Sequence, residues 1–375
     1  MELELSSDQR LFRSTTKSFL EKELPLERIR QLEGSDTGFD RDWWSRGAEL
    51  GWTAMLVPEE LGGGSVSGEG VRDLAIVAEE LGHGVAPGAL LATNIVLAGL
   101  VEAQAGASDH GEAIEALVSG ESVASWAVYE PGDQWAPLQP ALTAKASSGG
   151  YQLNGVKDRV ELAEQADLLL VTATTEQGVA QFLVPVSTAG VTVEPQWSLD
   201  VARRFGVVRF DNVEVPVSAL VASPGEDRVI ERQLQIALVL QCAETCGGLE
   251  RVFAFTTQWA FDRFSFGRPL ASYQALKHRF ADMRTWLEAC QATTQAAVTA
   301  VQERREDAAE LVSVAKSYVG DRSVQILQDC VQIHGGIGVT WEHDLHLYLR
   351  RATVNRSLFG TPEDHRRRLA DIAAL

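Results

Sequence analysis

Long apolar runs and positive charge are both scarce in this sequence. No stretch approaches about 18 consecutive apolar residues, so no membrane-spanning helix is predicted. Lysine and arginine total 33 against 52 aspartate and glutamate residues, which gives a formal net charge of −19. Because nucleic acids and anionic membrane surfaces attract clustered cations, we expect neither as a partner.

A leader pattern and paired cysteines are also missing. The first ten residues, MELELSSDQR, are acidic and do not have the basic-then-apolar layout of a signal peptide, so we expect a cytoplasmic protein. The four cysteines are Cys242, Cys246, Cys290 and Cys330, and no two have C-x-x-C spacing. In a cytoplasmic chain this favours buried, reduced thiols over a disulfide framework or a metal site.

Apolar and turn residues divide the 375-residue chain into three parts. The first part has helical periodicity after Ser6-Ser-Asp-Gln9, which fits a capping box. The middle part alternates short apolar runs, such as ADLLLVTA and FGVVRFDNVEV, with turn residues, which predicts antiparallel strands. Helices are predicted near residues 40–50, 67–82, 89–104, 110–119, 229–262, 272–304 and 307–334.

The last three of these helices are longer than an average helix, and antiparallel neighbours in a bundle would bury their apolar faces. We therefore predict an α+β chain of three domains. They are an N-terminal helical domain at 1–120, a middle antiparallel β domain at 121–222 and a C-terminal four-helix-bundle domain at 223–375.

Five short segments, spread in order along the chain, match a known family. They are Gly51-Trp52 with Val57-Pro-Glu-Glu-Leu-Gly-Gly63, Tyr129-Glu-Pro-Gly132, Leu153-Asn-Gly-Val-Lys157, Arg263-Phe-Ser-Phe-Gly-Arg-Pro-Leu-Ala-Ser-Tyr-Gln274 and Gln332-Ile-His-Gly-Gly-Ile-Gly338. With them the chain resembles the acyl-CoA dehydrogenase family over essentially its whole length. The resemblance implies the predicted fold, FAD as cofactor and an acyl-CoA thioester as substrate.

Two of these segments have the chemistry of a nucleotide site. Arg263 can bind a phosphate with two parallel hydrogen bonds, and Phe266 offers a flat aromatic face. The glycine loop at 335–338 can bring backbone N–H groups to a pyrophosphate, although it could also be a simple helix end. The resemblance implies that these segments bind the adenosine end of a flavin lying mostly in a neighbouring subunit. The residues that it assigns to the flavin are Arg263, Phe266, Gln274, Gln332, Gly335, Gly336 and Thr361.

The same resemblance implies an assembly and an electron acceptor. Members of the family form tetramers and pass electrons to an electron-transfer flavoprotein. The pattern Leu-Phe-Gly-Thr with His365-Arg366, in an acidic chain, resembles actinobacterial members. Several of those are heterotetramers of two related subunits that act on sterol-derived CoA thioesters, so a homotetramer and a heterotetramer both stay open.

The residue that should act as base is missing from both of its usual places. In the family a glutamate removes the α proton of the thioester while the β hydride passes to flavin. The two places that it occupies are matched here by Phe359 and Ala237. The resemblance also assigns a role to the backbone N–H of Phe359, which holds the enolate oxygen and survives the loss of a side chain. Arg159 also departs from the pattern, because many relatives have a tryptophan there near the flavin.

Glu244 is the alternative base that the sequence offers. It lies in an apolar helical run, two turns beyond Ala237 on the same face and about 10 Å along the axis. Burial would raise the pKa of such a carboxyl toward the range of a general base. The competing interpretation is a buried ion pair with Arg350, Arg351 or Arg356.

Three functions therefore stay open on the sequence. The first is a dehydrogenase that uses Glu244 or another relocated acid. The second is a non-catalytic partner subunit that completes the flavin site of a companion, which the loss of both base positions favours. The third is a flavin monooxygenase on the same fold, because such relatives also dispense with the base.

Overall fold

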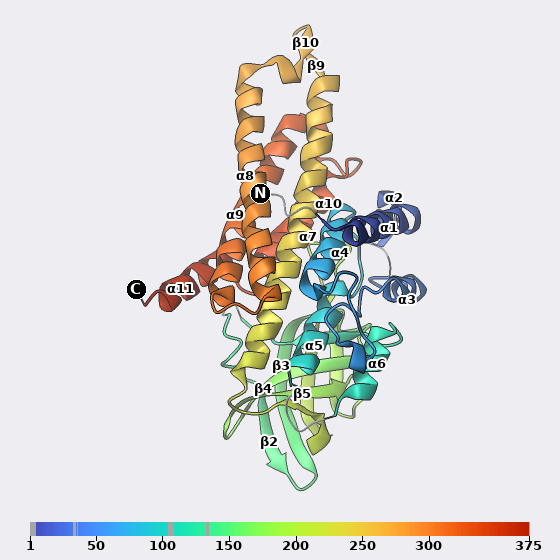
Figure 1. Ribbon diagram of the computed structural model, residues 1–375, viewed down its shortest axis with the longest axis vertical. Coiled ribbons are helices and arrows are strands. Elements are labelled where there is room, and N and C mark those ends of the chain that lie inside the picture. Colours follow the sequence, from blue (N-terminus) through green and yellow to red (C-terminus); the bar gives the residue numbers. More distant parts are fainter. Residues whose placement is uncertain (1–4, 33–34, 36, 104–108, 133–134, 375) are drawn as a thin grey trace.

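The computed structural model describes residues 5–32, 35, 37–103, 109–132 and 135–374. The molecule is elongated, with a helical bundle at one end, a β-sheet at the other and the N-terminal helices along one side (Figure 1). Helices, strands and helices follow one another in the predicted order. The domain boundaries at residues 120 and 222 stay predictions.

The N-terminal helices pack their aromatic residues together. The capping box predicted at the start of α1 is confirmed. The Ser6 hydroxyl accepts from the Gln9 N–H at 3.1 Å, and the Gln9 side-chain oxygen accepts from the Ser6 N–H at 3.1 Å. Phe19, Trp43 and Trp52 then form one cluster with ring centroids 5.5–6.3 Å apart. The elements are α1 (Ser7–Glu23), α2 (Leu26–Gln31), α3 (Arg41–Glu49), η2 (Glu59–Leu61), α4 (Gly70–His83), α5 (Leu90–Ala103) and α6 (Gly111–Val118).

The middle strands form one sheet in the order β6-β7-β3-β2-β4-β5-β8, with β1 also paired to β4. Most pairs are antiparallel, as predicted, but β1 and β2 pair with β4 in parallel, so the sheet is mixed. The parallel pairs arise because β1 and β2 both run in the same direction as β4. The strands are β1 (Ala124–Ala127), β2 (Thr143–Ser147), β3 (Gly150–Glu161), β4 (Leu168–Thr175), β5 (Gly178–Pro185), β6 (Val191–Gln196), β7 (Phe205–Pro216) and β8 (Leu220–Ala222), with η3 (Val217–Ala219) before β8.

The C-terminal bundle is built on three long helices. The predicted helices near 229–262, 272–304 and 307–334 are confirmed as α7, α8 and α9. The elements are α7 (Asp227–Asp262), β9 (Phe264–Ser265), β10 (Arg268–Pro269), η4 (Leu270–Ser272), α8 (Gln274–Gln302), α9 (Ala308–His334), η5 (Gly335–Val339), α10 (Leu345–Ser357) and α11 (Pro362–Ile372).

Helices α4 and α7 touch backbone to backbone. A Cβ atom on Gly82 would lie 1.8 Å from the Glu244 carbonyl oxygen, and one on Gly247 would lie 1.9 Å from the Glu79 carbonyl oxygen. Only glycine tolerates such an approach. This crossing fixes the middle of α7, including Glu244, against the N-terminal helices.

The buried thiols predicted from the cysteine count are present. Cys242, Cys246, Cys290 and Cys330 are all free and buried. Burial raises the pKa of the Cys242 thiol to about 12, so it stays protonated at neutral pH. Within the described part of the chain, no helix is both long enough and apolar enough to cross a membrane.

Candidate functional site

A short turn between α10 and α11 carries two of the predicted site residues. Phe359 and Gly360 both have left-handed backbone conformations, with φ of 58° and 89°. Thr361 then caps α11, because its hydroxyl accepts from the Asp364 N–H at 3.2 Å and donates to the Asp364 carboxylate at 2.7 Å. The left-handed conformation is unfavourable for phenylalanine, so contacts around the 358–361 turn must hold it.

Both polar groups of Phe359 are engaged within the chain. Its N–H, the donor that the sequence predicts for an enolate oxygen, donates instead to the hydroxyl of Tyr129. Burial raises the pKa of that hydroxyl, so Tyr129 stays neutral. The Phe359 carbonyl lies 2.8 Å from Nε2 of His365, whose pKa burial lowers to about 4, so a neutral imidazole donates this bond.

Aromatic side chains fill the space beside the turn, which we call the ring seat. The Phe359 ring packs against those of Trp126, Tyr129 and Trp135, with centroids 6.1–6.4 Å apart. The Arg159 guanidinium lies 4.9 Å above the Tyr129 ring. The cavity that remains is about 20 Å³, enough for a water molecule. Ligand pockets are typically about 300 Å³ or more, so the space that the described residues leave beside the turn is too small for a flavin ring.

Glu244 is buried in an ion-pair network rather than facing the ring seat. Its carboxylate accepts from Arg203 at 2.8 Å, from Arg351 at 2.6 Å and from the Asn355 amide at 2.9 Å. Of the arginines suggested by the sequence, Arg351 is therefore a partner. Burial acts to raise the pKa of Glu244, but the charges of Arg203 and Arg351 outweigh it, and the pKa lies below its usual value. A carboxylate held in this way is a weak base, so the contacts favour the structural interpretation.

Glu161 is a carboxylate that the sequence reasoning missed. It ends β3, pairs with Arg203 at 3.4 Å and lines the 20 Å³ cavity together with Phe359. Burial raises its pKa. The alternation of side chains along β3 does not predict this placement. The strand is irregular between Lys157 and Val160, and Arg159 has a left-handed φ of 48°.

The six other predicted flavin residues lie at the ends of α7, α8 and α9 that point away from the sheet, a region that we call the bundle tip. There β9 and β10 form a small hairpin between α7 and α8 (Figure 1). The Arg263 guanidinium lies 5.9 Å above the Trp259 ring, and that ring stacks on His334 at 5.2 Å. Trp259 thus joins the end of α7 to the glycine loop after α9. The predicted residues at these helix ends and in the adjoining loops are Arg263, Phe266, Gln274, Gln332, Gly335 and Gly336.

Side chains at the bundle tip are exposed to solvent, whereas those at the 358–361 turn are buried. Phe266 is 96% exposed, although a phenylalanine of a single-chain protein is normally covered. Other large apolar side chains are exposed at the end of α7, in the β9–β10 hairpin and in the segment after α9, namely Phe261, Phe264, Ile337, Val339 and Trp341. An open surface with an arginine, aromatic faces and exposed glycines fits the adenosine and phosphate half of FAD.

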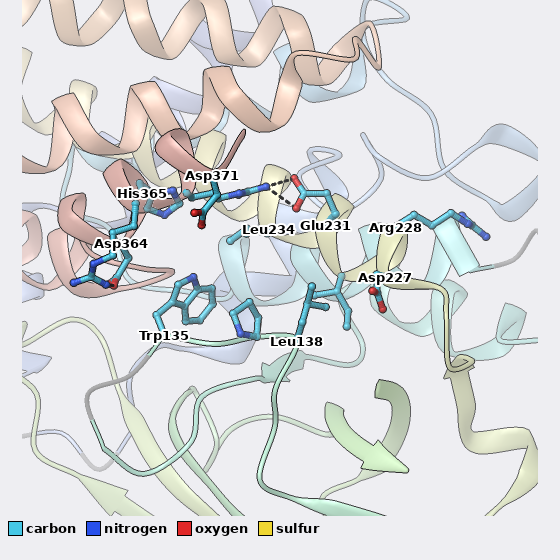
Figure 2. A pocket seen from close by; sticks show the side chains of 13 residues that line it. Trp135, Leu138, Asp227, Arg228, Glu231, Leu234, Asp364, His365 and Asp371 are labelled. Atoms are coloured by element: carbon cyan, nitrogen blue, oxygen red, sulfur yellow. Dashed lines mark hydrogen bonds and ion pairs between the residues drawn. The ribbon is translucent and has the colours of Figure 1, made fainter. Parts of the chain in front are cut away.

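A separate cavity of about 530 Å³ lies between α11, the first turns of α7 and the segment 135–138 (Figure 2). None of the predicted site residues lines it. Its arginines are already paired: Arg368 donates to Glu231 at 2.6 Å and Arg367 to Asp364 at 2.7 Å. With its cations neutralised by acids, this cavity does not suit a ligand rich in phosphate.

Comparisons with known proteins agree with the layout of the chain. Residues 6–121 match the acyl-CoA dehydrogenase N-terminal domain and residues 227–374 the acyl-CoA dehydrogenase C-terminal domain. The acyl-CoA dehydrogenase IpdE2 of Mycobacterium tuberculosis is 30% identical over 369 residues, which are 96% of each chain.

Two solved structures at 25% sequence identity are similar over nearly the whole chain. One is the Tcur3481-Tcur3483 steroid ACAD, with a TM-score of 0.87 over 98% of this chain and 97% of that chain. The other is the ChsE4-ChsE5 complex from Mycobacterium tuberculosis, with a TM-score of 0.87 over 100% of this chain and 99% of that chain.

Proposed function

Since this chain belongs to the acyl-CoA dehydrogenase family, we propose that it acts as the companion subunit of a heteromeric enzyme. FAD is the cofactor, and the reaction is the α,β-dehydrogenation of an acyl-CoA thioester. In the proposed assembly, the bundle tip binds the adenosine end of a flavin whose ring lies in a related second subunit. The ring seat of this chain stays filled by its own side chains.

The difference between the ring seat and the bundle tip carries the proposal. The seat holds a cavity of about 20 Å³ beside Phe359, whereas the tip presents Phe266 at 96% exposure. A self-sufficient subunit needs room for the flavin ring and the thioester next to the turn. A companion subunit needs only the tip, and it is free to use the seat for packing.

The bound flavin would be shared between two chains. Arg263 supplies a cation and Phe266 a flat surface, and the exposed Gly335 and Gly336 leave N–H groups accessible. FAD supplies the hydride acceptor when it is bound. This chain holds and orients the nucleotide end and excludes water from it.

The similar complexes support a heteromer and a bulky substrate. Tcur3481-Tcur3483 and ChsE4-ChsE5 each combine two proteins, and the first is described as a steroid ACAD. We propose a sterol-derived or similarly bulky acyl group for the enzyme to which this chain contributes. An electron-transfer flavoprotein is the proposed electron acceptor.

A dehydrogenase with its base in this chain is the second candidate, and Glu161 favours it. Its carboxyl faces the cavity beside Phe359 and has a raised pKa, as a general base requires. Glu244 is the less suitable base, because two arginines hold it ionised. For Glu161 to act, Trp135 and Tyr129 would have to leave the seat.

Flavin stoichiometry separates these candidates. The chain is purified alone and after co-expression with a related acyl-CoA dehydrogenase subunit from the same organism, and FAD is quantified by its 450 nm absorbance. We expect no FAD in the chain alone and one FAD per pair of chains in the complex. Bleaching by acyl-CoA thioesters without oxygen should survive Glu161→Gln and Glu244→Gln in the complex. One FAD per chain in the protein purified alone, bleached by thioesters, would overturn the proposal.

Variants at the tip locate the site. Arg263→Ala should weaken FAD binding by the complex about tenfold or more, because a charged hydrogen bond to phosphate is lost. Arg209→Ala is the matched control, since Arg209 is an exposed arginine on β7 whose one ion-pair partner among the described residues is Glu194. Retention of FAD by the Arg263 variant at the level of the control would exclude the tip as the flavin site.

A further inference from the structure

A lysine is buried in the bundle core, behind the 358–361 turn. Lys316 lies in the middle of α9 and is 2% exposed. Within the described part of the chain its hydrogen bonds go to an amide oxygen and two backbone carbonyls, and none goes to a carboxylate. A buried lysine without a counter-ion is costly, so its polar surroundings need an explanation.

Three oxygen atoms surround the Lys316 ammonium group. They are the side-chain oxygen of Gln241 on α7 and the backbone carbonyls of Asn355 and Leu358 at the end of α10, the last at 2.7 Å. An ammonium group has three donors, and all three are used. The two carbonyls belong to the C-terminus of α10, where a cation is favoured by the helix dipole.

One of these carbonyls, that of Leu358, belongs to the peptide whose N–H faces the ring seat. The carbonyl of Leu358 and the N–H of Phe359 are the two ends of a single planar peptide unit. Lys316 binds the oxygen end from the bundle side, and the Tyr129 hydroxyl binds the N–H end from the sheet side. A charged donor on the oxygen polarises the peptide and strengthens its N–H as a donor.

We propose that Lys316 is a positioning residue that orients the Leu358–Phe359 peptide and thereby aims the Phe359 N–H at Tyr129. The left-handed φ of Phe359 is fixed from both sides, with Lys316 on the carbonyl before it and His365 on the carbonyl after it. Without Lys316, the peptide is free to rotate and the N–H leaves the seat. This role concerns the inside of one chain, so it stands or falls independently of the proposed heteromer.

The sequence makes a selective measurement possible. The chain contains only two Leu-Phe pairs, Leu11-Phe12 and Leu358-Phe359. Labelling leucine carbonyls with ¹³C and phenylalanine nitrogens with ¹⁵N therefore gives two amide signals in a carbonyl-correlated NMR spectrum of the purified protein. The Phe12 signal, from α1, is an internal control for the fold.

Lys316→Met keeps the length of the side chain and removes its donors. We expect the Phe359 signal to move and its amide to exchange with solvent about tenfold faster, while the Phe12 signal is unchanged. Tyr129→Phe should produce the same loss of protection from the other end of the peptide. The double variant should exchange no faster than either single variant, because both act on one peptide. A Phe359 signal that keeps its position and exchange rate in folded Lys316→Met overturns the proposal.

A second measurement needs no variant. Burial lowers the pKa of Lys316 to about 7, so its charge changes near neutral pH. The titratable neighbours change charge outside this range, since burial lowers the pKa of His365 to about 4 and raises that of Cys242 to about 12. The other charged groups that face Lys316 are the guanidinium groups of Arg203 and Arg356. Raising the pH through neutrality should move the Leu358–Phe359 signal with one midpoint and leave Leu11–Phe12 in place. A stationary signal would contradict the inference.

Discussion

The bundle tip and the 358–361 turn belong to the same helical bundle but are packed in opposite ways. At the tip, Arg263 has no carboxylate partner among the described residues, and Phe266 projects into solvent. At the turn, every polar atom of the Phe359 backbone is engaged and its ring is enclosed by three other aromatic rings. The tip therefore leaves a cation and an aromatic face open to solvent, as the proposed flavin site requires, whereas the groups at the turn are already engaged within the chain.

The same contrast holds for charge. Near the turn, Glu161, Asp200 and Glu244 pair with Arg203 and Arg351 in a buried network that joins β3, α7 and α10. Such a network costs stability if one member is removed, because the others stay buried and uncompensated. At the tip, a cation without a partner costs little because water solvates it. Stability should thus respond to changes at the turn and flavin binding to changes at the tip.

The largest effect on stability is expected from Glu244→Ala. It leaves Arg203 and Arg351 buried without their shared carboxylate, so we expect a loss of about 3–5 kcal/mol in the free energy of unfolding. Urea unfolding followed by circular dichroism measures it. Glu194→Ala, which breaks an exposed pair with Arg209, is the control and should leave the free energy of unfolding nearly unchanged, because solvent screens that pair. Equal losses in the two variants would mean that the network is not structural.

Phe359→Ala is expected to have the second largest effect on stability, because it opens a cavity in a buried aromatic cluster. We expect a loss of about 3 kcal/mol in the free energy of unfolding. Phe359→Gly creates a similar cavity but suits the left-handed φ of 58°, so it should lose about 1 kcal/mol less than the alanine variant. If glycine is no better than alanine, the backbone of the turn is not strained.

The pH dependence of stability tests the buried lysine at the turn. The folded pKa of Lys316 is about 7, whereas an unfolded lysine titrates near about 10.4, so between these values the unfolded chain binds more protons. Stability conferred at this position should therefore rise with pH across that window, by at most about 1.4 kcal/mol per pH unit. Lys316→Met should remove this slope. The measurement is the difference in free energy of unfolding between the native chain and the variant, determined at each pH. A difference that does not vary with pH would place the folded pKa near its ordinary value.

The smallest effect on stability is expected from Phe266→Ala. The side chain is 96% exposed, so the free energy of unfolding of the isolated chain should change by less than about 0.5 kcal/mol. The same variant should nevertheless weaken flavin binding by the assembled enzyme, because an aromatic face is lost. A clear fall in the melting temperature of the isolated chain would show that the tip is packed within one subunit.

Much of the fold could be predicted because its signals are local. The helices at 229–262, 272–304 and 307–334 were predictable from apolar periodicity, and the capping box at Ser6 from four consecutive residues. The parallel pairing of β1 and β2 with β4 was not, because pairing joins segments far apart in the sequence. For the same reason Glu161 was overlooked, since the irregular β3 breaks the alternation that would have placed it.

The sequence by itself determined the order of the elements, the family and the absence of a carboxylate at Phe359 and Ala237, because each is written in neighbouring residues. Only the tertiary structure decided what that absence means. It placed Glu244 between two arginines, Tyr129 against the Phe359 N–H and Lys316 behind the same peptide. These contacts join residues more than 40 positions apart, and their energies depend on burial and mutual orientation, which no local pattern encodes.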